Sequence, residues 1–209
     1  MKLSIIIPVF DEQENIKPLY QSIQKAVLPL NIDWELILVD DGSRDRSLEV
    51  IKEIAQKDPR HTSAIVLRRN FGQTAAIAAG IDHAGGDVIV LLDADLQNDP
   101  ADIPLLLDKI NEGYDVVSGW RYDRKDKFLT RIFPSRIANW LISSVTGVHL
   151  HDYGCTLKAY RREVITGFHL YGEMHRFIPV YANSVGAKIT EIRVHHHPRT
   201  YGHTKYGLE

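Results

Sequence analysis

Short apolar runs alternate with amphipathic stretches through the first 120 residues of the chain. The runs are rich in β-branched residues and leucine, a pattern typical of strands buried on both faces of a sheet. Apolar residues three or four apart between the runs predict helices with one buried face. Strands are expected at 3–9, 35–39, 64–67, 88–92 and 115–119, and helices around 16–27, 48–54, 74–81 and 104–111. This alternation predicts an α/β fold, with a mostly parallel sheet and helices on both faces.

The pattern changes after residue 121. Between Lys125 and Val145, lysines and arginines are interleaved with aromatic and aliphatic residues, which predicts a basic amphipathic helical segment split at Pro134. Such a segment could lie in a membrane interface, or pack on the core with its basic side in water. Beyond it we expect a strand at 155–159, a helix at 177–185, a strand at 188–195 and a mobile loop at 198–207.

Composition narrows the possible classes of protein. The chain has 209 residues, a net charge of -2 and 44% hydrophobic residues, as expected for a globular protein without the broad basic face of a general nucleic-acid binder. A single cysteine, Cys155, excludes an internal disulfide. Because the N-terminus enters an expected strand directly and no apolar stretch approaches the ~20 residues of a spanning helix, we expect neither a signal peptide nor a membrane span in this sequence.

Two aspartates and a glutamine follow the fourth expected strand. Asp93, Asp95 and Gln97 are spaced two apart, so in an extended segment their side chains project to one side. Neighbouring carboxylates repel unless a cation lies between them, and oxygen ligands suit Mg²⁺ or Mn²⁺. Such ions keep positions open for substrate phosphates. The pattern indicates a metal that holds a diphosphate, although a solvated turn has similar residues.

Acidic residues also follow the first two expected strands. Glu12 comes after the first strand, and Asp40 and Asp41 after the second. Ligands of parallel sheets bind at this edge, and carboxylates can accept hydrogen bonds from base N–H and ribose hydroxyl groups. The glycine-rich phosphate loop of dinucleotide folds is missing after the first strand, which disfavours a hydride-transfer enzyme. Arg121, after the fifth strand, offers a forked donor to phosphate or forms a surface ion pair.

The second half of the chain contributes further candidates. Arg199 and Lys205 flank a glycine, with hydroxyl residues between them, which suits a flexible loop closing over phosphate oxygens. Asp152 stands two residues before Gly154 and could be a general base, an acceptor for a sugar hydroxyl, or part of a structural turn.

Together these motifs resemble glycosyltransferase family 2, and within it the polyprenyl-phosphate glycosyltransferases. The resemblance extends over nearly the whole chain, and its marks are the segments 6–12, 39–43, 69–73, 93–97, 119–122 and 199–205. Segments 152–155, 159–162, 177–179 and 195–196 look most like bacterial undecaprenyl-phosphate aminoarabinose transferases. Glucosyl transferases and dolichol-phosphate mannose synthases look more distant.

The resemblance implies a GT-A fold and an inverting, metal-dependent transfer of sugar from a UDP- or GDP-sugar to a polyprenyl phosphate at the cytoplasmic face of the cell membrane. Residues 1–121 would be the nucleotide-sugar-binding half, and 122–209 the acceptor-side half, of one domain. The membrane helices that follow in such relatives are missing, so we expect a piece of a longer, membrane-anchored protein that could form homo-oligomers. The alternative is a family 2 enzyme with a hydroxyl acceptor and Asp152 as its general base.

The resemblance also implies roles for individual residues. The nucleotide would contact Pro8, Phe10, Glu12, Asp40, Asp41, Asp93 and Ala94. Mg²⁺ or Mn²⁺ would bind Asp93, Asp95 and Gln97. Phosphate and acceptor groups would meet Arg121, Arg131, Arg136, Arg199 and Lys205. Asp95, Arg121 and Asp152 would be catalytic.

Overall fold

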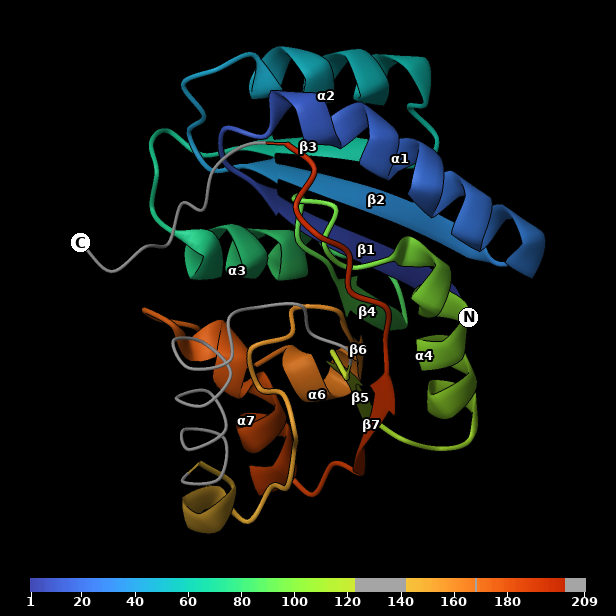
Figure 1. Ribbon diagram of the computed structural model, residues 1–209, viewed down its shortest axis with the longest axis vertical. Coiled ribbons are helices and arrows are strands. Elements are labelled where there is room, and N and C mark those ends of the chain that lie inside the picture. The colour runs from blue at the N-terminus through green and yellow to red at the C-terminus, as the bar shows by residue number, and fades with distance from the viewer. Residues whose placement is uncertain (123–141, 168, 202–209) are drawn as a thin grey trace.

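A computed structural model shows one mixed sheet at the centre of the fold (Figure 1). The structure describes residues 1–122, 142–167 and 169–201. Within these residues the strand order is β3-β2-β1-β4-β6-β5-β7. The strands are β1 Lys2–Val9, β2 Asp33–Asp40, β3 Thr62–Val66, β4 Val88–Leu91, β5 Val116–Trp120, β6 Lys158–Arg161 and β7 Ile189–Arg193. All neighbours pair in parallel except β6, which is antiparallel to both β4 and β5.

Helices cover both faces of this sheet, as predicted (Figure 1). They are α1 Gln13–Val27, α2 Ser47–Lys57, α3 Gln73–His83, α4 Ile103–Asn111, α6 Arg162–Ile165 and α7 Ile178–Ser184, with 3-10 turns η1 Leu28–Leu30, η2 Pro100–Asp102 and η4 Met174–Phe177. Alternate residues of β1 point to opposite faces. Ile5 and Ile7 pack in a core with α1, α2 and α4, whereas Ile6 packs in a core with α3, α6 and α7.

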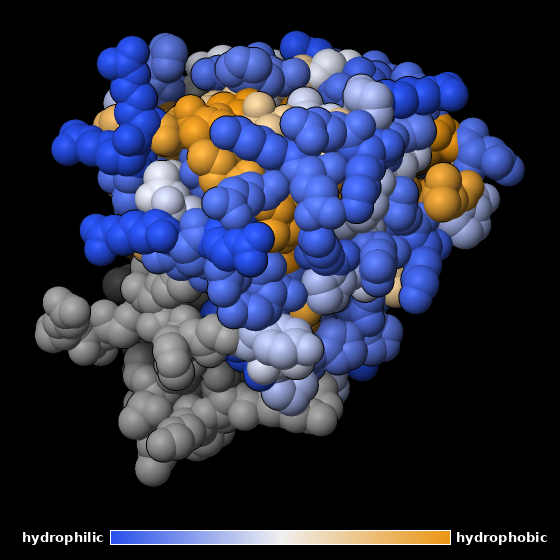
Figure 2. Space-filling view, turned by 90° about the horizontal axis from the view of Figure 1, so that it is seen from above, coloured by the Kyte–Doolittle hydropathy of each residue, from blue (hydrophilic) through white to orange (hydrophobic). Residues whose placement is uncertain are grey.

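The helices are amphipathic, and their outer sides are polar. In α1 the buried side chains include Ile16, Leu19 and Ile23, spaced three and four apart as the sequence pattern predicts. Seen from above, over α1 and α2, the surface is mostly hydrophilic, with one band of apolar side chains and a smaller apolar cluster at the edge of the molecule (Figure 2). No described helix is long and apolar enough to cross a bilayer. The predicted basic amphipathic segment falls mainly on residues 123–141, outside the described residues.

Two local expectations are wrong. The strand expected at 155–159 lies at Lys158–Arg161, because Cys155 and Leu157 are buried in the connection that leads into the sheet. The segment 93–97 is a turn and not an extended strand end, since β4 ends at Leu91 and Leu96 takes a left-handed conformation (φ 61°). Asp93, Asp95 and Gln97 therefore do not project to one side from an extended segment.

Candidate active site

A cavity of about 170 Å³ lies where β1, β2 and β4 end. Of the residues proposed from the sequence, its lining includes Pro8, Phe10, Glu12, Asp41, Asp93, Ala94, Asp95 and Arg199. Four others, Asp40, Gln97, Arg121 and Asp152, stand outside the lining formed by the described residues. Arg131, Arg136 and Lys205 lie outside the described residues altogether. The fold thus gathers the acids of three strand ends and one distant arginine around a single space.

The outer end of the cavity is built from the loops after β1 and β2. The buried Asp41 carboxylate accepts hydrogen bonds from the backbone N–H groups of Phe71 (2.8 Å) and Gly72 (2.9 Å), which precede α3. Burial raises the pKa of Asp41. Gly42 makes this turn possible, because its φ is +71° and a Cβ there would lie 2.4 Å from the Arg69 carbonyl carbon.

Asp93 lines the cavity, and its carboxylate accepts hydrogen bonds from two neutral donors. Gln73 Nε2 donates to one carboxylate oxygen at 2.7 Å, and Thr156 Oγ1 donates to the other at 2.6 Å. Burial and the nearby Asp95 carboxylate raise the pKa of Asp93 to about 6. The site therefore carries the like-charge repulsion that a cation would relieve.

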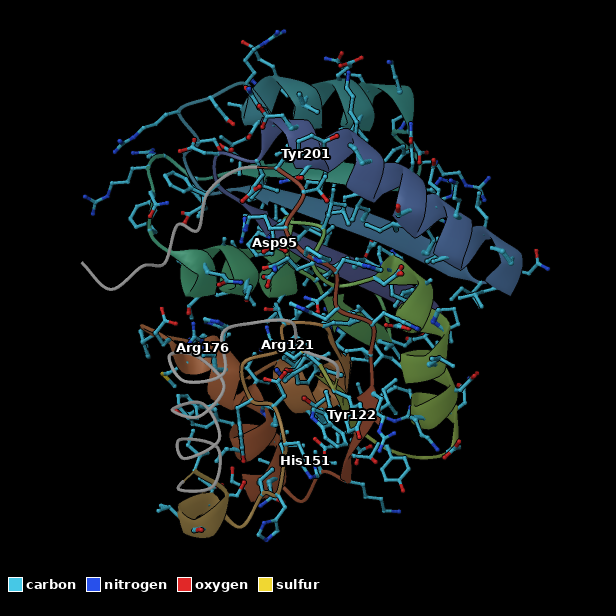
Figure 3. The ribbon with its side chains drawn as sticks, viewed as in Figure 1. Asp95, Arg121, Tyr122, His151, Arg176 and Tyr201 are labelled. Carbon is cyan, nitrogen blue, oxygen red and sulfur yellow. The ribbon has the colours of Figure 1, made fainter. Side chains whose placement is uncertain are left out.

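The partner of Asp95 comes from the far end of the chain. Arg199 Nη2 donates to Asp95 Oδ2 at 2.6 Å, and Arg199 Nη1 lies 3.6 Å from Glu12 Oε1. One guanidinium thus bridges the acids that follow β1 and β4. Figure 3 shows Asp95 between the upper layer of the molecule and Arg121 and Arg176 below it.

Two histidine contacts fix the strap, residues 194–201, that carries Arg199. His195 Nδ1 lies 2.8 Å from Asp102 Oδ1, and His197 Nε2 lies 2.9 Å from Asp99 Oδ2. Asp102 is buried in η2, and it raises the pKa of His195 through the hydrogen bond between them. The strap is therefore attached to the loop that follows Asp95, which accounts for the place of Arg199.

Arg121 and Asp152 form a bidentate ion pair beside the cavity. Arg121 Nε donates to Asp152 Oδ2 at 2.7 Å, and Arg121 Nη2 donates to Oδ1 at 2.9 Å. The backbone N–H of Gly154 also donates to Oδ1, at 3.1 Å. Asp152 thus holds Arg121 and the turn before β6, an arrangement that joins two residues which the sequence placed in separate roles.

The inner end of the cavity contains residues that the sequence did not single out as site residues. Lys158 and Tyr160 project from β6, and His175 and Arg176 come from η4. His175 Nδ1 lies 2.7 Å from Thr74 Oγ1 in α3. Burial lowers the pKa of His175 to about 4, so the ring is neutral at pH 7. In the sequence, the i, i+2 spacing of Lys158 and Tyr160 indicates only that the two side chains would share one face of a strand. The sheet pairing is needed to show that this face borders the cavity.

The acids fit a divalent cation that substrate oxygens would help to bind. The described residues contain no group of three or more His, Cys, Asp or Glu side chains arranged to hold a metal. Asp93 and Asp95 supply oxygen donors, and burial together with the Asp95 carboxylate raises the pKa of Asp93. Mg²⁺ commonly binds one or two carboxylates together with substrate phosphates. The donor set therefore matches an ion that arrives with a phosphate ligand.

Two curated proteins are similar to this chain over nearly its whole length. The chain is 44% identical to a dodecaprenyl-phosphate galacturonate synthase of Rhizobium johnstonii, with 100% of the chain and 62% of that protein covered. It is 43% identical to an undecaprenyl-phosphate 4-deoxy-4-formamido-L-arabinose transferase of Pseudomonas aeruginosa, with 98% and 60% covered. The chain thus spans about three fifths of the length of these curated relatives.

A solved structure shows the same fold at low sequence identity. The glucosyl-3-phosphoglycerate synthase of Mycobacterium tuberculosis, solved with Mn²⁺, UDP and phosphoglyceric acid, superposes with a TM-score of 0.74 at 19% identity. The match covers 95% of this chain and 72% of that protein. This likeness confirms the predicted GT-A fold, and the two relatives confirm the resemblance to the polyprenyl-phosphate branch. Since residues 4–168 also match the family described as Glycosyl transferase family 2, the chain belongs to that family.

Proposed function

We propose that this chain is the catalytic part of an enzyme that moves a sugar from a nucleoside diphosphate sugar to a polyprenyl phosphate, with inversion at the anomeric carbon. The observation that carries this proposal is the meeting of Asp93, Asp95 and Arg199 in one cavity. Acids beside an arginine suit a diphosphate bound together with a cation. The relatives at 43–44% identity are named for transfer to dodecaprenyl and undecaprenyl phosphates.

The strand order suggests how the donor lies in the cavity. From β2 through β1 to β4, the lining passes from Asp41 to Glu12 and then to Asp93. Carboxylates at the β2 and β1 ends can accept hydrogen bonds from base N–H and ribose hydroxyl groups. The diphosphate would then lie beside Asp95 and Arg199, and the sugar would reach toward β6. This order supports the nucleotide contacts proposed from the sequence.

A divalent cation fits the middle of this path. Mg²⁺ or Mn²⁺ would be held by Asp93 and Asp95, with Gln97 as the further candidate. When bound, the cation neutralises charge on the leaving diphosphate. Arg199, now paired to Asp95, would turn its guanidinium toward the phosphate oxygens as the donor enters.

The acceptor chemistry favours a lipid phosphate over a hydroxyl group. The second pKa of a phosphate monoester is ~6, so the nucleophile is largely ionised at neutral pH and needs positioning and charge neutralisation more than a base. A hydroxyl acceptor needs a general base within hydrogen-bond reach. Asp152 is instead engaged by Arg121 and stands outside the cavity lining formed by the described residues. This observation supports the phosphate acceptor.

The lipid acceptor implies a place for the enzyme. We propose that it works at the cytoplasmic face of the cell membrane, where a nucleotide sugar and a polyprenyl phosphate can meet. Arg131, Arg136 and Lys205 remain candidates for contact with the acceptor or the membrane surface. The partners are then the sugar nucleotide, the lipid and the membrane, and a second copy of the protein in the full-length form.

The proposal is tested by measuring binding and transfer separately. Thermal shifts of the chain with UDP, GDP and their sugars, with and without Mn²⁺, should show one preferred base, because ligand-linked stabilisation grows with concentration over the dissociation constant. D95N should abolish the Mn²⁺-dependent part of the shift, whereas D108N, which alters an exposed aspartate on α4, should keep it.

Transfer is measured with the full-length protein, using dodecaprenyl-type phosphate and an oligosaccharide as competing acceptors. Sugar should appear on the lipid phosphate with inverted configuration. Transfer to the oligosaccharide alone would contradict the proposal and favour the hydroxyl-acceptor alternative.

A further inference from the structure

At the inner end of the cavity, a buried ammonium group has no carboxylate hydrogen-bond partner in the part of the chain that the structure describes. Lys158 is 2% exposed and lines the cavity. Among the described residues its Nζ donates only to backbone carbonyl oxygens, those of Tyr153 at 3.1 Å and of Cys155. Buried charges in proteins are normally paired. Burial lowers the pKa of Lys158, although the charges of Asp152 and Asp93 act in the opposite direction.

A buried hydroxyl without a partner stands two residues along the same strand. Tyr160 is 0% exposed, and its Oη has no hydrogen-bond partner among the described residues. Both side chains belong to β6 and line the same cavity, so they share a face of the strand. A buried hydroxyl without a hydrogen-bond partner costs free energy, and the Tyr160 hydroxyl can donate to a group that enters the cavity.

Further donors complete this end of the cavity. Arg176 lies at its rim, with a half-exposed side chain that is 3.2 Å from Glu173, and the neutral His175 lies next to it. Asp93 lines the same cavity. In Figure 3, Arg176 lies below Asp95, on the side of the molecule that holds α7. The end of the cavity beyond Asp93 is thus rich in cations and hydrogen-bond donors.

We propose that this pocket of Lys158, Tyr160 and Arg176 binds a carboxylate on the transferred sugar, so that the donor is a nucleotide-linked uronic acid. The inference rests on the proposed function, because it needs the diphosphate beside Asp95 and the sugar over β6. A carboxylate can form an ion pair with the Lys158 ammonium and accept a hydrogen bond from the Tyr160 hydroxyl. The CH₂OH group of a neutral hexose would leave the Lys158 charge unpaired. The proposed reaction has two other anions that could occupy this pocket, the donor diphosphate and the acceptor phosphate.

The test compares donors that differ only at C6. Calorimetric titration of the chain with UDP-glucuronate against UDP-glucose, and with UDP-galacturonate against UDP-galactose, is carried out with Mn²⁺, and UDP alone serves as the reference. We expect at least one uronate to bind about tenfold or more tightly than its neutral match, as hydrogen bonds to a charged group give.

Variants then assign the preference to residues. Y160F removes only the unpartnered hydroxyl, so it should melt no lower than the parent chain while it loses most of the uronate preference. K158M should lose the preference and leave the affinity for UDP unchanged. T62V removes a buried hydroxyl from β3, at the edge of the sheet away from β6, and should keep the preference.

Three outcomes would overturn the inference. Neutral sugars that bind as tightly as uronates would show that no carboxylate is recognised. If K158M loses as much affinity for UDP as for the UDP-uronate, the pocket binds the diphosphate and not the sugar carboxylate. If neither UDP nor GDP binds with Mn²⁺, the proposed function fails together with the inference, whereas binding of nucleotides without a uronate preference refutes the inference alone.

Discussion

Replacing Asp152 by Asn tests whether this carboxylate anchors Arg121 or takes a proton. The two side chains are 7% and 14% exposed and meet through two short hydrogen bonds. Asn keeps the shape of Asp but not its charge, so the guanidinium loses its countercharge. Removing one partner of a buried ion pair costs about 3–5 kcal/mol. Because Arg121 keeps some exposure, we expect about 3 kcal/mol of lost stability, the lower end of that range.

Urea unfolding followed by circular dichroism gives this loss directly. For a chain of this size, the same loss lowers the melting temperature by about 6–12 °C. E49Q is the matched control, because it breaks an Arg46–Glu49 pair whose side chains are 79% and 68% exposed, and it should leave the unfolding midpoint unchanged. The double variant R121M/D152L replaces both charges by apolar groups and should regain most of the lost stability.

Activity separates the two roles of Asp152. If the residue is an anchor, D152N should retain sugar transfer to the lipid phosphate at temperatures where it is folded. A D152N protein that unfolds like the wild type but transfers no sugar would refute the anchoring argument. It would restore Asp152 as a general base.

Two further predictions concern stability. Burial lowers the pKa of His175 to about 4 from 6.5, so the unfolded chain takes up this proton first as the pH falls. The free energy of unfolding should drop by up to about 3 kcal/mol from pH 7 to pH 4. Urea titrations should show a smaller drop in H175Q, and equal drops would contradict the assignment. G42A should lose more stability in the same assay than G113A, which costs about 1–2 kcal/mol for its φ alone. Only at Gly42 does the new Cβ also meet Arg69, 2.4 Å away, so equal losses would count against that contact.

The sequence predicted most of the strands because burial on both faces leaves a local trace. The runs around β1 and β4 are apolar at successive positions and rich in β-branched residues, as in strands that are buried on both faces. The acids after them could be assigned to one edge, since parallel strands end on the same side. Asp41, Asp93 and Asp95 were found in this way, and the structure places all three around one cavity.

The inner pocket could not be predicted in the same way. Lys158 pairs with Leu91 in β4, although 66 positions separate them, and no local pattern specifies this antiparallel partner. The turn at Leu96 also lacked a signal, because its left-handed backbone is rare for a leucine. Arg199 was expected to meet phosphate, but its ion pair with Asp95 depends on the histidine contacts of the strap. Tertiary pairing decided each of these positions.

The insertion of β6 between β4 and β5 has a consequence for how the chain must be handled and made. A fragment that stops after β5 would leave β4 and β5 each with a bare row of amide and carbonyl groups and no intervening strand. Exposed apolar edges of this kind invite pairing between molecules. On the ribosome, the sheet cannot close before Arg161 has emerged from the exit tunnel. Expression boundaries and split reporters should therefore keep β4, β5 and β6 on one polypeptide.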